Sequence, residues 1–409
     1  MAETMRLYHP TGILSGKVKL PASKSLSNRA LIIKALSQNI SEVSNLSEAK
    51  DTQILLRLLK SNDYELNAED AGTVFRFMTA YLSIQQGSKL LTGSERMLER
   101  PIGPLVSALR EIGADIDYMK MPGFPPLKFN AFQGQTGKSV KIDASVSSQF
   151  ISALMLISPL LPCGLVIELV GGAVSKPYVN MTASLMRNFG AEVLLSEASI
   201  EIKSKPYQNF FYQVEADWSA GSYFYSLMAL SKGGTIFVEG LRPDSLQGDK
   251  SVVEIYEKYF GVMTKFTENG AVLIKSNAVG FDRSISFIDT PDLAQTFVVT
   301  AAAFRKKLKI YGLKTLKLKE TDRTAALQTE LNKLKVSFRP TRYDAFLLEA
   351  LDFDLNDDLI VDTYGDHRMA MSFSPLALLK PVVIKSPKVV EKSFPGFWQE
   401  LQNLGFVFE

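Results

Sequence analysis

The chain contains very few of the residues that carry metal or redox chemistry. Among its 409 residues there are one cysteine, Cys163, and two histidines, His9 and His367. One cysteine excludes a disulfide framework within the chain and a zinc site of the usual cysteine-rich kind. Because Cys163 lies in the apolar segment LPCGLVIEL, we expect an inert, buried thiol at this position.

The chain also lacks long hydrophobic runs and a large net charge. No stretch is apolar enough to span a membrane, and the first residues, MAETMRLYHPTG, lack the apolar core of a signal peptide. We therefore expect a cytoplasmic protein without a membrane partner. The formal net charge of +3 is too small for a dedicated nucleic-acid binder, so basic residues matter only where they cluster.

Several common catalytic motifs are missing from the sequence. There is no GxxxxGK[ST] loop, no GxGxxG after a strand, and no GxSxG at a strand–helix turn. No group of histidine and acidic residues has the spacing of a metal site. These absences leave metal-free chemistry on small anions, carried out by lysine, arginine, aspartate and glutamate.

A repeated pattern organises the chain. A helix-like run ends at a glycine or an equivalent residue and a short strand-like run follows, at Gly113, Gly190, Gly261, Lys335 and Gly405. A weaker copy, LLRLLKSNDYEL, precedes them. The spacing of about 70 residues indicates a helix-and-strand unit repeated about six times, and glycine suits the left-handed position after a helix. We predict an α/β protein with two domains and half of the repeats on each side of residue 215.

Basic and hydroxyl residues gather where helices are expected to begin. Leu26, Ala30, Ile33 and Leu36 form one face of a helix that Ser23 or Ser25 can cap. Another helix is expected to begin at Pro101, directly after Arg96 and Arg100. The residues at the expected helix starts are Lys24, Ser25, Arg29, Gly72, Thr73, Arg76, Ser147, Ser148, Gln149, Ser175 and Tyr178.

Helix starts bind phosphates and carboxylates through free N–H groups and the helix dipole. A single serine there is more often a plain N-cap, and a single arginine is more often a solvated surface charge. The whole set, however, indicates a site for a molecule with several negative charges.

The second half of the chain mixes charges of both signs in short motifs. These motifs are PDLAQT with Asp292, KETDR with Lys319, Glu320 and Arg323, GDHRMAM with Asp366, His367 and Arg368, and EKSFP with Lys392. For KETDR the alternative is a row of local ion pairs within a helix, and for His367 a hydrogen-bonded structural role. A carboxylate among many cations can stay ionised and transfer a proton to or from a substrate.

In their order along the chain, these motifs resemble the EPSP synthase family. The resemblance covers nearly the whole sequence and depends on LPASKSLSNRAL, DAGTVFR, LTGSERMLERPIGPLVSAL, SVSSQF, SKPY, PDLAQT, KETDR, GDHRMAM and KSFP together. It implies a two-domain inverse α/β barrel-like fold in which each domain has three βαβαββ units and the active site lies in the interdomain cleft. The implied domains are residues 1–21 with 216–409, which form a discontinuous domain, and residues 22–215.

The resemblance also implies a reaction. A 3-phosphoshikimate 1-carboxyvinyltransferase transfers the enolpyruvyl group of phosphoenolpyruvate to the 5-hydroxyl of shikimate 3-phosphate and releases phosphate. The family uses addition and then elimination through a tetrahedral ketal, without a metal or an organic cofactor. The implied pathway leads to chorismate and the aromatic amino acids, and we expect a cytoplasmic monomer.

Roles carry over from the family motif by motif. Lys24, Asp292, Glu320 and His367 are the implied catalytic residues. In this assignment Asp292 accepts the hydroxyl proton and Glu320 handles the proton at the methylene carbon. The implied ligands of shikimate 3-phosphate are Lys24, Ser25, Arg29, Ser147, Ser148, Gln149, Ser175, Tyr178, Asp292 and Lys319. The implied ligands of phosphoenolpyruvate are Lys24, Gly72, Arg100, Gln149, Arg323, Arg368 and Lys392.

Four positions depart from the family pattern. Ala22 replaces a usual glycine, Asp70 a usual asparagine, Phe77 a common proline, and Thr315 an asparagine that usually contacts shikimate 3-phosphate. Asp70 and Phe77 are close to Gly72 in the sequence, which leaves the response to the inhibitor glyphosate open.

Two alternatives remain at this point. The sister enzyme, UDP-N-acetylglucosamine enolpyruvyl transferase, usually carries a reactive cysteine on a loop, whereas Cys163 lies in an apolar run. A non-enzymatic anion or nucleic-acid binder is disfavoured by the near-balanced charge and by carboxylates among the cations.

Overall fold

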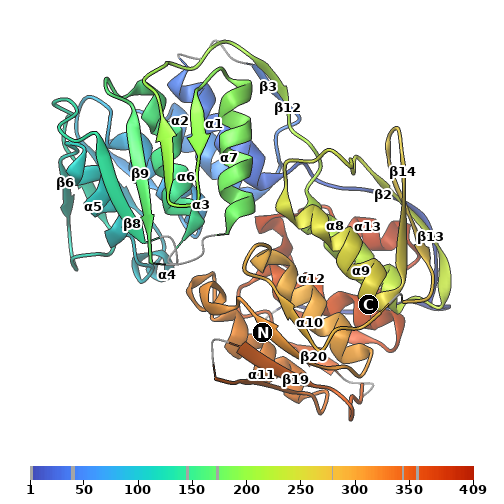
Figure 1. Ribbon diagram of the computed structural model, residues 1–409. Helices are drawn as coiled ribbons and strands as arrows, with labels where there is room; N and C mark the ends of the chain where they lie inside the picture. Colours follow the sequence, from blue (N-terminus) through green and yellow to red (C-terminus); the bar gives the residue numbers. More distant parts are fainter. Residues whose placement is uncertain are drawn as a thin grey trace. The chain divides into compact units, whose positions relative to one another are not determined.

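The computed structural model describes residues 3–37, 42–143, 147–171, 175–278, 280–342, 345–355 and 359–409. The chain divides into two compact units (Figure 1). Unit 1 comprises Met1–Ala22 and Glu215–Glu409, and unit 2 comprises Ser23–Val214. Both units combine helices with small sheets, which confirms the predicted α/β class.

Unit 1 contains three four-stranded sheets in its described residues. In spatial order, they are β20 (Leu359–Val361), β21 (Val382–Lys385), β1 (Thr4–Tyr8) and β22 (Val407–Phe408); β14 (Val262–Thr267), β15 (Gly270–Lys275), β13 (Gly233–Glu239) and β2 (Ile13–Lys19); and β16 (Ser284–Ser286), β17 (Lys307–Tyr311), β19 (Ala345–Glu349) and β18 (Ser337–Pro340).

Unit 2 contains two four-stranded sheets and one two-stranded sheet in its described residues. They are β10 (Val193–Leu195), β11 (Ser199–Ile202), β9 (Leu165–Val170) and β8 (Ser139–Asp143); β4 (Glu65–Asn67), β5 (Lys89–Thr92), β7 (Leu127–Phe129) and β6 (Ile116–Tyr118); and the parallel pair β12 (Phe211–Gln213) and β3 (Glu42–Ser44).

All the four-stranded sheets share one topology. Each has a parallel pair at one side, such as β8 with β9 or β16 with β17, and its other neighbours are antiparallel. Parallel neighbours need a crossover connection, and here a helix supplies it. In the last sheet β1 takes the third place, between β21 and β22.

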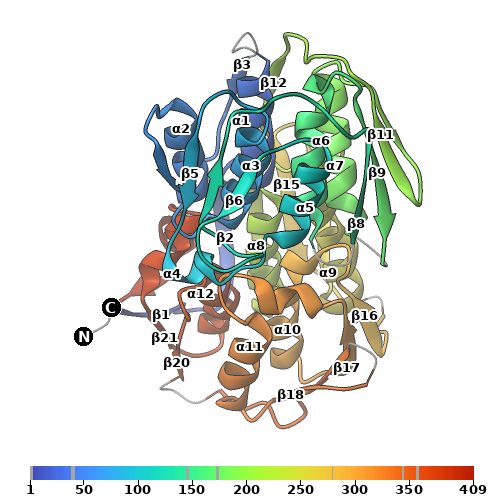
Figure 2. The same ribbon diagram turned by 90° about the vertical axis from the view of Figure 1, so that its left-hand side faces the viewer.

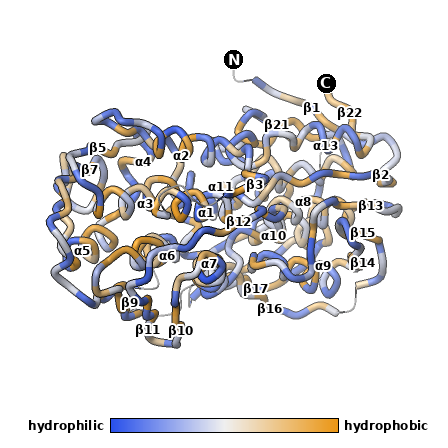
Figure 3. Tube along the Cα trace, turned by 90° about the horizontal axis from the view of Figure 1, so that it is seen from above, coloured by the Kyte–Doolittle hydropathy of each residue, from blue (hydrophilic) through white to orange (hydrophobic). Residues whose placement is uncertain are grey.

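The crossover helices form the core of each unit. They are α8 (Trp218–Leu230), α10 (Ala294–Ala303) and α12 (His367–Phe373) in unit 1, and α1 (Lys24–Leu36), α3 (Gly72–Leu82) and α6 (Ser148–Ile157) in unit 2. Within each unit these three helices pack against one another. They are buried on nearly every side, as expected for helices that are hydrophobic around their whole circumference. Much of α3 and α6 is orange in Figure 3.

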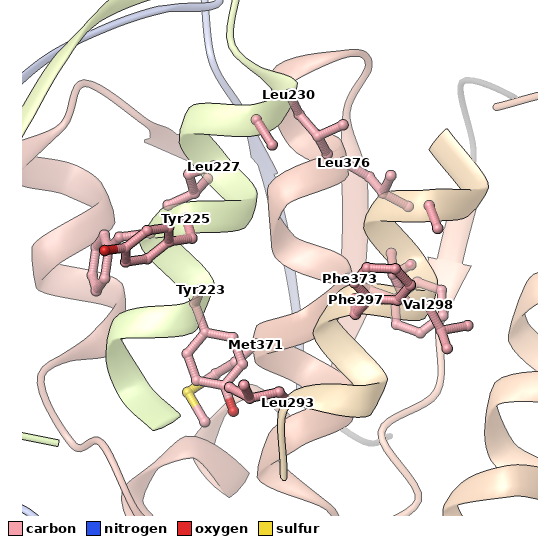
Figure 4. Packing of buried hydrophobic residues seen from close by; sticks show 14 of the residues in the cluster. Tyr223, Tyr225, Leu227, Leu230, Leu293, Phe297, Val298, Met371, Phe373 and Leu376 are labelled. Atoms are coloured by element: carbon pink, nitrogen blue, oxygen red, sulfur yellow. The ribbon is translucent and has the colours of Figure 1, made fainter. Parts of the chain in front are cut away.

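Aromatic and aliphatic side chains fill the core of unit 1. Figure 4 shows Tyr223 and Leu227 of α8 and Phe297 of α10, with Phe373 at the end of α12. All four are fully buried or nearly so. This packing fixes the α8, α10 and α12 helices and therefore the residues at their N-termini.

The remaining helices lie outside these cores or between the core and the sheets. They are α2 (Lys50–Lys60), α4 (Glu95–Leu98), α5 (Gly103–Glu111) and α7 (Lys176–Asn188) in unit 2, and α9 (Val252–Phe260), α11 (Arg323–Asn332) and α13 (Phe397–Asn403) in unit 1. Figure 2 shows α6 and α7 alongside strands β8, β9 and β11.

The predicted ends of the repeats are confirmed at all five strong copies. Gly113, Gly190, Gly261 and Gly405 have positive φ angles, and so does Lys335, with φ 57°. The weaker copy differs, because the residue after α2, Ser61, has an ordinary extended conformation. Its turn therefore does not need the left-handed backbone that favours glycine.

Two expectations about the sequence are wrong. Cys163 is exposed rather than buried, because it lies in the turn before β9 and its apolar neighbours belong to two different elements. The helix expected at Pro101 begins at Gly103 instead, with Pro104 in its first turn, and Arg96 lies inside the short helix α4. Among the described residues, no helix combines the length and hydropathy needed to cross a membrane.

We expect Lys335→Gly to be more stable than Lys335→Ala by about 1 kcal/mol, because the left-handed backbone strains any residue with a Cβ atom. Both variants lose the ion pair between Lys335 and Asp354, so their difference isolates the backbone. Urea unfolding measures it. At Ala325, an exposed helical position in α11, glycine should instead destabilise by up to about 1 kcal/mol. If glycine were less stable than alanine at both positions, the left-handed backbone at Lys335 would be contradicted.

Candidate functional site

The predicted helix starts of unit 2 lie where the sequence places them. Helix α1 begins at Lys24 and Ser23 is its cap, accepting a hydrogen bond from the Leu26 N–H. Helix α3 begins at Gly72. Helix α6 begins at Ser148 with Ser147 as its cap, and α7 follows Ser175.

The first turns of these helices contact one another. The side-chain amide of Gln149, at the start of α6, donates to the Thr73 hydroxyl at the start of α3 over 2.9 Å. One turn further in, Arg29 of α1 donates to Ser152 of α6 and to Thr182 of α7. The starts of all four helices therefore lie at one end of unit 2, where their free N–H groups favour an anion.

Arg29 is held by uncharged groups. Its Nε donates to Thr182 Oγ1 over 2.7 Å, Nη1 to the Ser25 carbonyl over 2.9 Å, and Nη2 to Ser152 Oγ over 3.1 Å. Burial lowers the pKa of Arg29 to about 10, against the opposing effect of Tyr178. The group stays protonated near neutral pH and is a strong candidate for anion binding.

Lys24 has a carboxylate partner that sequence reasoning missed. Its Nζ lies 3.1 Å from Asp51 Oδ2 on α2. Asp51 is buried, whereas the Lys24 side chain keeps 16% of its surface exposed. Nothing in the local sequence distinguishes Asp51 from an ordinary acidic residue in the first turn of a helix.

Gly72 gives room to an arginine. The guanidinium of Arg100 lies so close that a Cβ atom at position 72 would stand 2.4 Å from its Nη1. Arg76, one turn into α3, donates to the Gly72 carbonyl and lies 5.7 Å from the ring centre of Phe150. Both arginines are buried, so unit 2 gathers three buried guanidinium groups close to its helix starts.

The charged motifs of unit 1 form one cluster around Arg323. This residue opens α11 and is 1% exposed. Its Nε lies 2.6 Å from Asp366, its Nη2 2.8 Å from Glu320, and its Nη1 3.2 Å from Asp292. Burial lowers the pKa of Arg323, but the three carboxylates outweigh it and raise that pKa above its usual range.

Three further cations reach the same carboxylates. Arg368 lies 3.0 Å from Asp292, Lys319 3.8 Å from Asp292, and Lys392 3.6 Å from Glu320. Burial lowers the pKa of Lys319, and Asp292 partly offsets that effect. Among the described residues, the ion pairs of this cluster join four cations to three carboxylates, a balance that favours an anion.

The N-cap of α12 belongs to this cluster, and the N-cap of α11 directly precedes Arg323. Asp322 caps α11, so KETDR stands at a helix start and the alternative of ion pairs within a helix is wrong. Asp366 caps α12 and accepts from the Arg368 N–H over 2.8 Å. His367 is buried beside it, with Nδ1 3.6 Å from Asp366 Oδ1. The sequence motifs assign Asp366 no catalytic or binding role, although its contact with Arg323 makes it a central residue of the charged cluster.

Asp249 is a third residue that sequence reasoning missed. It is buried in the short 3-10 helix Gly248–Ser251 that precedes α9, and it accepts a hydrogen bond from the Ser219 hydroxyl. Burial, with Asp292 nearby, raises the pKa of Asp249 to about 7, against the opposing effects of Ser219 and Arg368. A carboxyl group that titrates near neutral pH beside charged residues is typical of functional sites. Its sequence context, LQGDK, carries no signal for this.

Four further predicted residues lie near the helix starts of unit 2 and are less buried than the arginines. Ser25, Ser148, Ser175 and Tyr178 are partly exposed near the helix starts of unit 2. Among the described residues, no group of three or more histidine, cysteine, aspartate or glutamate side chains is arranged to hold a metal ion.

Comparisons with known proteins show the family of this chain. A family model described as EPSP synthase (3-phosphoshikimate 1-carboxyvinyltransferase) matches residues 9–61 and 57–401. A protein of Bacteroides fragilis (strain YCH46) named 3-phosphoshikimate 1-carboxyvinyltransferase is 43% identical over 396 residues, which cover 96% of each chain. One of the same name from Sulfurovum sp. (strain NBC37-1) is 36% identical over 436 residues, covering 97% of this chain and 98% of that one.

A solved structure shares the fold. EPSP synthase from Acinetobacter baumannii superposes with a TM-score of 0.75 over 100% of both chains, at 20% sequence identity. This likeness concerns the fold alone, and it confirms the fold that the sequence predicted.

We expect Asp249→Asn to flatten the pH dependence of stability between about pH 4 and pH 7. The pKa of Asp249 is about 7 in the folded protein, above its ordinary value of 3.8. The folded protein therefore keeps a proton that the unfolded chain releases. The stabilisation is complete below about pH 4 and is lost as the pH rises to 7, by about 1 kcal/mol per pH unit.

Urea unfolding of wild type and variant between about pH 5 and pH 8 measures this trend. The variant should gain stability relative to wild type as the pH rises towards 7. Asp244→Asn is the control, because Arg242 lowers the pKa of that exposed carboxylate. Parallel curves for wild type and Asp249→Asn would contradict the raised pKa.

Proposed function

Because the chain belongs to the EPSP synthase family, we infer that its two sets of charged residues serve a single enolpyruvyl transfer. The enzyme transfers the carboxyvinyl group of phosphoenolpyruvate to the 5-hydroxyl of shikimate 3-phosphate and releases phosphate. The observation that carries the assignment of residues is the cluster in which Arg323 holds Asp292 and Glu320 among further cations. Two polyanionic substrates need cations, and proton transfer needs positioned carboxylates.

Shikimate 3-phosphate is assigned mainly to the helix starts of unit 2. The supporting features are the free N–H groups of the α6 and α7 first turns and the buried cation of Arg29. The proposed ligands are Lys24, Ser25, Arg29, Ser147, Ser148, Gln149, Ser175 and Tyr178, with Asp292 and Lys319 from unit 1.

Phosphoenolpyruvate is assigned to guanidinium and ammonium groups from both units. Arginine forks match carboxylate and phosphate oxygens, and Arg323 and Arg368 are already fixed by carboxylates. The proposed ligands are Lys24, Gly72, Gln149, Arg100, Arg323, Arg368 and Lys392.

The proton transfers are assigned to two carboxylates. In the addition step, Asp292 takes the proton of the 5-hydroxyl while that oxygen bonds to the central carbon of phosphoenolpyruvate, and Glu320 gives a proton to the methylene carbon. In the elimination step, Glu320 takes a proton back from the methyl group, the bond to phosphate breaks, and the proton held by Asp292 leaves with the phosphate. Both carboxylates lie against Arg323, which favours the ionised form in which each of them accepts a proton. Lys24 contacts both substrates near the reacting centre, and His367 assists by hydrogen bonding.

The remaining properties follow the family expectation. We propose that its domains are residues 1–21 with 216–409 and residues 22–215, which differ from the two compact units only at Ala22 and Glu215. We also propose that the enzyme works as a monomer in the cytoplasm.

A phosphate-release assay with each substrate omitted in turn tests the function. Phosphate should appear only when phosphoenolpyruvate and shikimate 3-phosphate are both present. UDP-N-acetylglucosamine in place of shikimate 3-phosphate should give none. Activity with the UDP-sugar alone would assign the chain to the sister reaction, and no release with either acceptor would refute the function.

We expect Glu320→Gln to lower kcat by about 10²- to 10⁴-fold, because the amide cannot exchange the proton at the methylene carbon. Glutamine keeps the size of the side chain and a hydrogen-bond acceptor for Arg323, so the KM values should change little. Steady-state kinetics measures this split. Glu349→Gln, at an exposed carboxylate that is also paired with lysine and arginine, is the control and should leave kcat unchanged. An unaltered kcat in Glu320→Gln would exclude the proton role.

A further inference from the structure

Arg29 is almost completely enclosed, with 2% of its surface exposed. Within the described part of the chain, three of its five N–H groups donate to Thr182, Ser25 and Ser152. One N–H on each terminal nitrogen remains for an incoming oxygen. The guanidinium of Arg29 is therefore oriented before the substrate binds, and two of its N–H groups can still donate to a substrate oxygen.

An aromatic ring completes this enclosure. The Phe77 ring centre lies 5.3 Å from the central carbon of the Arg29 guanidinium. Phe77 is 1% exposed and comes from α3, whereas the hydrogen-bond partners come from α1, α6 and α7. A cation at this distance from a ring is attracted by the negative face of the ring, and more strongly when both are removed from water.

The choice of an aromatic partner has a consequence for anion binding. In unit 1 the buried guanidinium of Arg323 is neutralised by carboxylates, which occupy its N–H groups. A ring attracts Arg29 without adding net negative charge and without accepting its in-plane N–H groups. Arg29 therefore keeps its full positive charge for a substrate.

We propose that Phe77 is a positioning residue for substrate binding, which holds the Arg29 guanidinium in the plane that receives the anionic acceptor substrate. This inference rests on the proposed function, in which Arg29 binds shikimate 3-phosphate. Phe77 acts through Arg29 alone, so its effect belongs to the binding of the acceptor substrate and not to phosphoenolpyruvate or to the chemical steps.

The test compares variants of one helix. Phe77→Leu keeps an apolar side chain but removes the ring, and it should raise the Kd for shikimate 3-phosphate about tenfold. Phe77→Tyr keeps the ring and should bind nearly as wild type. Phe75→Leu is the matched control, since Phe75 is equally buried in α3 and no cation lies over its ring among the described residues.

The measurements are the Kd for shikimate 3-phosphate by calorimetry, the KM for phosphoenolpyruvate, kcat and the thermal midpoint. Phe77→Leu and Phe75→Leu should lower the thermal midpoint similarly, yet only Phe77→Leu should weaken acceptor binding. Equal Kd values for these two variants would overturn the proposal, as would a loss confined to kcat.

A double-variant cycle separates the role of Arg29 in substrate binding from the role of Phe77 in positioning Arg29. If Phe77 acts through Arg29, Phe77→Leu should have no further effect on the Kd in an Arg29→Ala background. An Arg29→Ala variant that binds shikimate 3-phosphate normally would refute the proposed role of Arg29 itself. Weakened binding in Arg29→Ala with an independent, additive effect of Phe77→Leu would refute only the positioning role.

Discussion

The charged half of the site in unit 1 depends on one buried guanidinium. Arg323 stands at the start of α11 and reaches the cap of α12 through Asp366 and the segment before α10 through Asp292. A buried charge is tolerated only when it is paired and hydrogen-bonded, and removing one partner leaves the others uncompensated. Arg323 thus fixes the starts of three helices while holding the carboxylates that we propose for proton transfer.

The two units stabilise their buried cations by different means. Unit 1 pairs Arg323 and Arg368 with carboxylates that also belong to the proposed proton-transfer machinery. Unit 2 surrounds Arg29 with hydroxyls, a carbonyl and a ring. In unit 1 the cations and the proposed bases form one cooperative group. In unit 2 the positive charge of Arg29 is not neutralised by a carboxylate partner among the described residues, so we propose that it serves a ligand.

Local features of this protein could be predicted from its sequence, and contacts between distant segments could not. The caps Ser23 and Ser147 follow from residue types beside a helical pattern, and the left-handed residue after each helix follows from the repeat. The partners Asp51 and Asp366 and the ring of Phe77 depend on segments that meet only in the fold. Cys163 was misjudged for the related reason that neighbours in sequence did not share one element.

The position of β1 has a consequence for the way this chain is made. Its residues Thr4–Tyr8 lie between β21 and β22, which come from the opposite end of the sequence. During synthesis on the ribosome, β1 emerges long before β21 and β22 are translated. Its backbone N–H and C=O groups therefore have no strand partner while unit 2 is translated. The sheet that closes unit 1 can form only after β22 (Val407–Phe408) has left the exit tunnel.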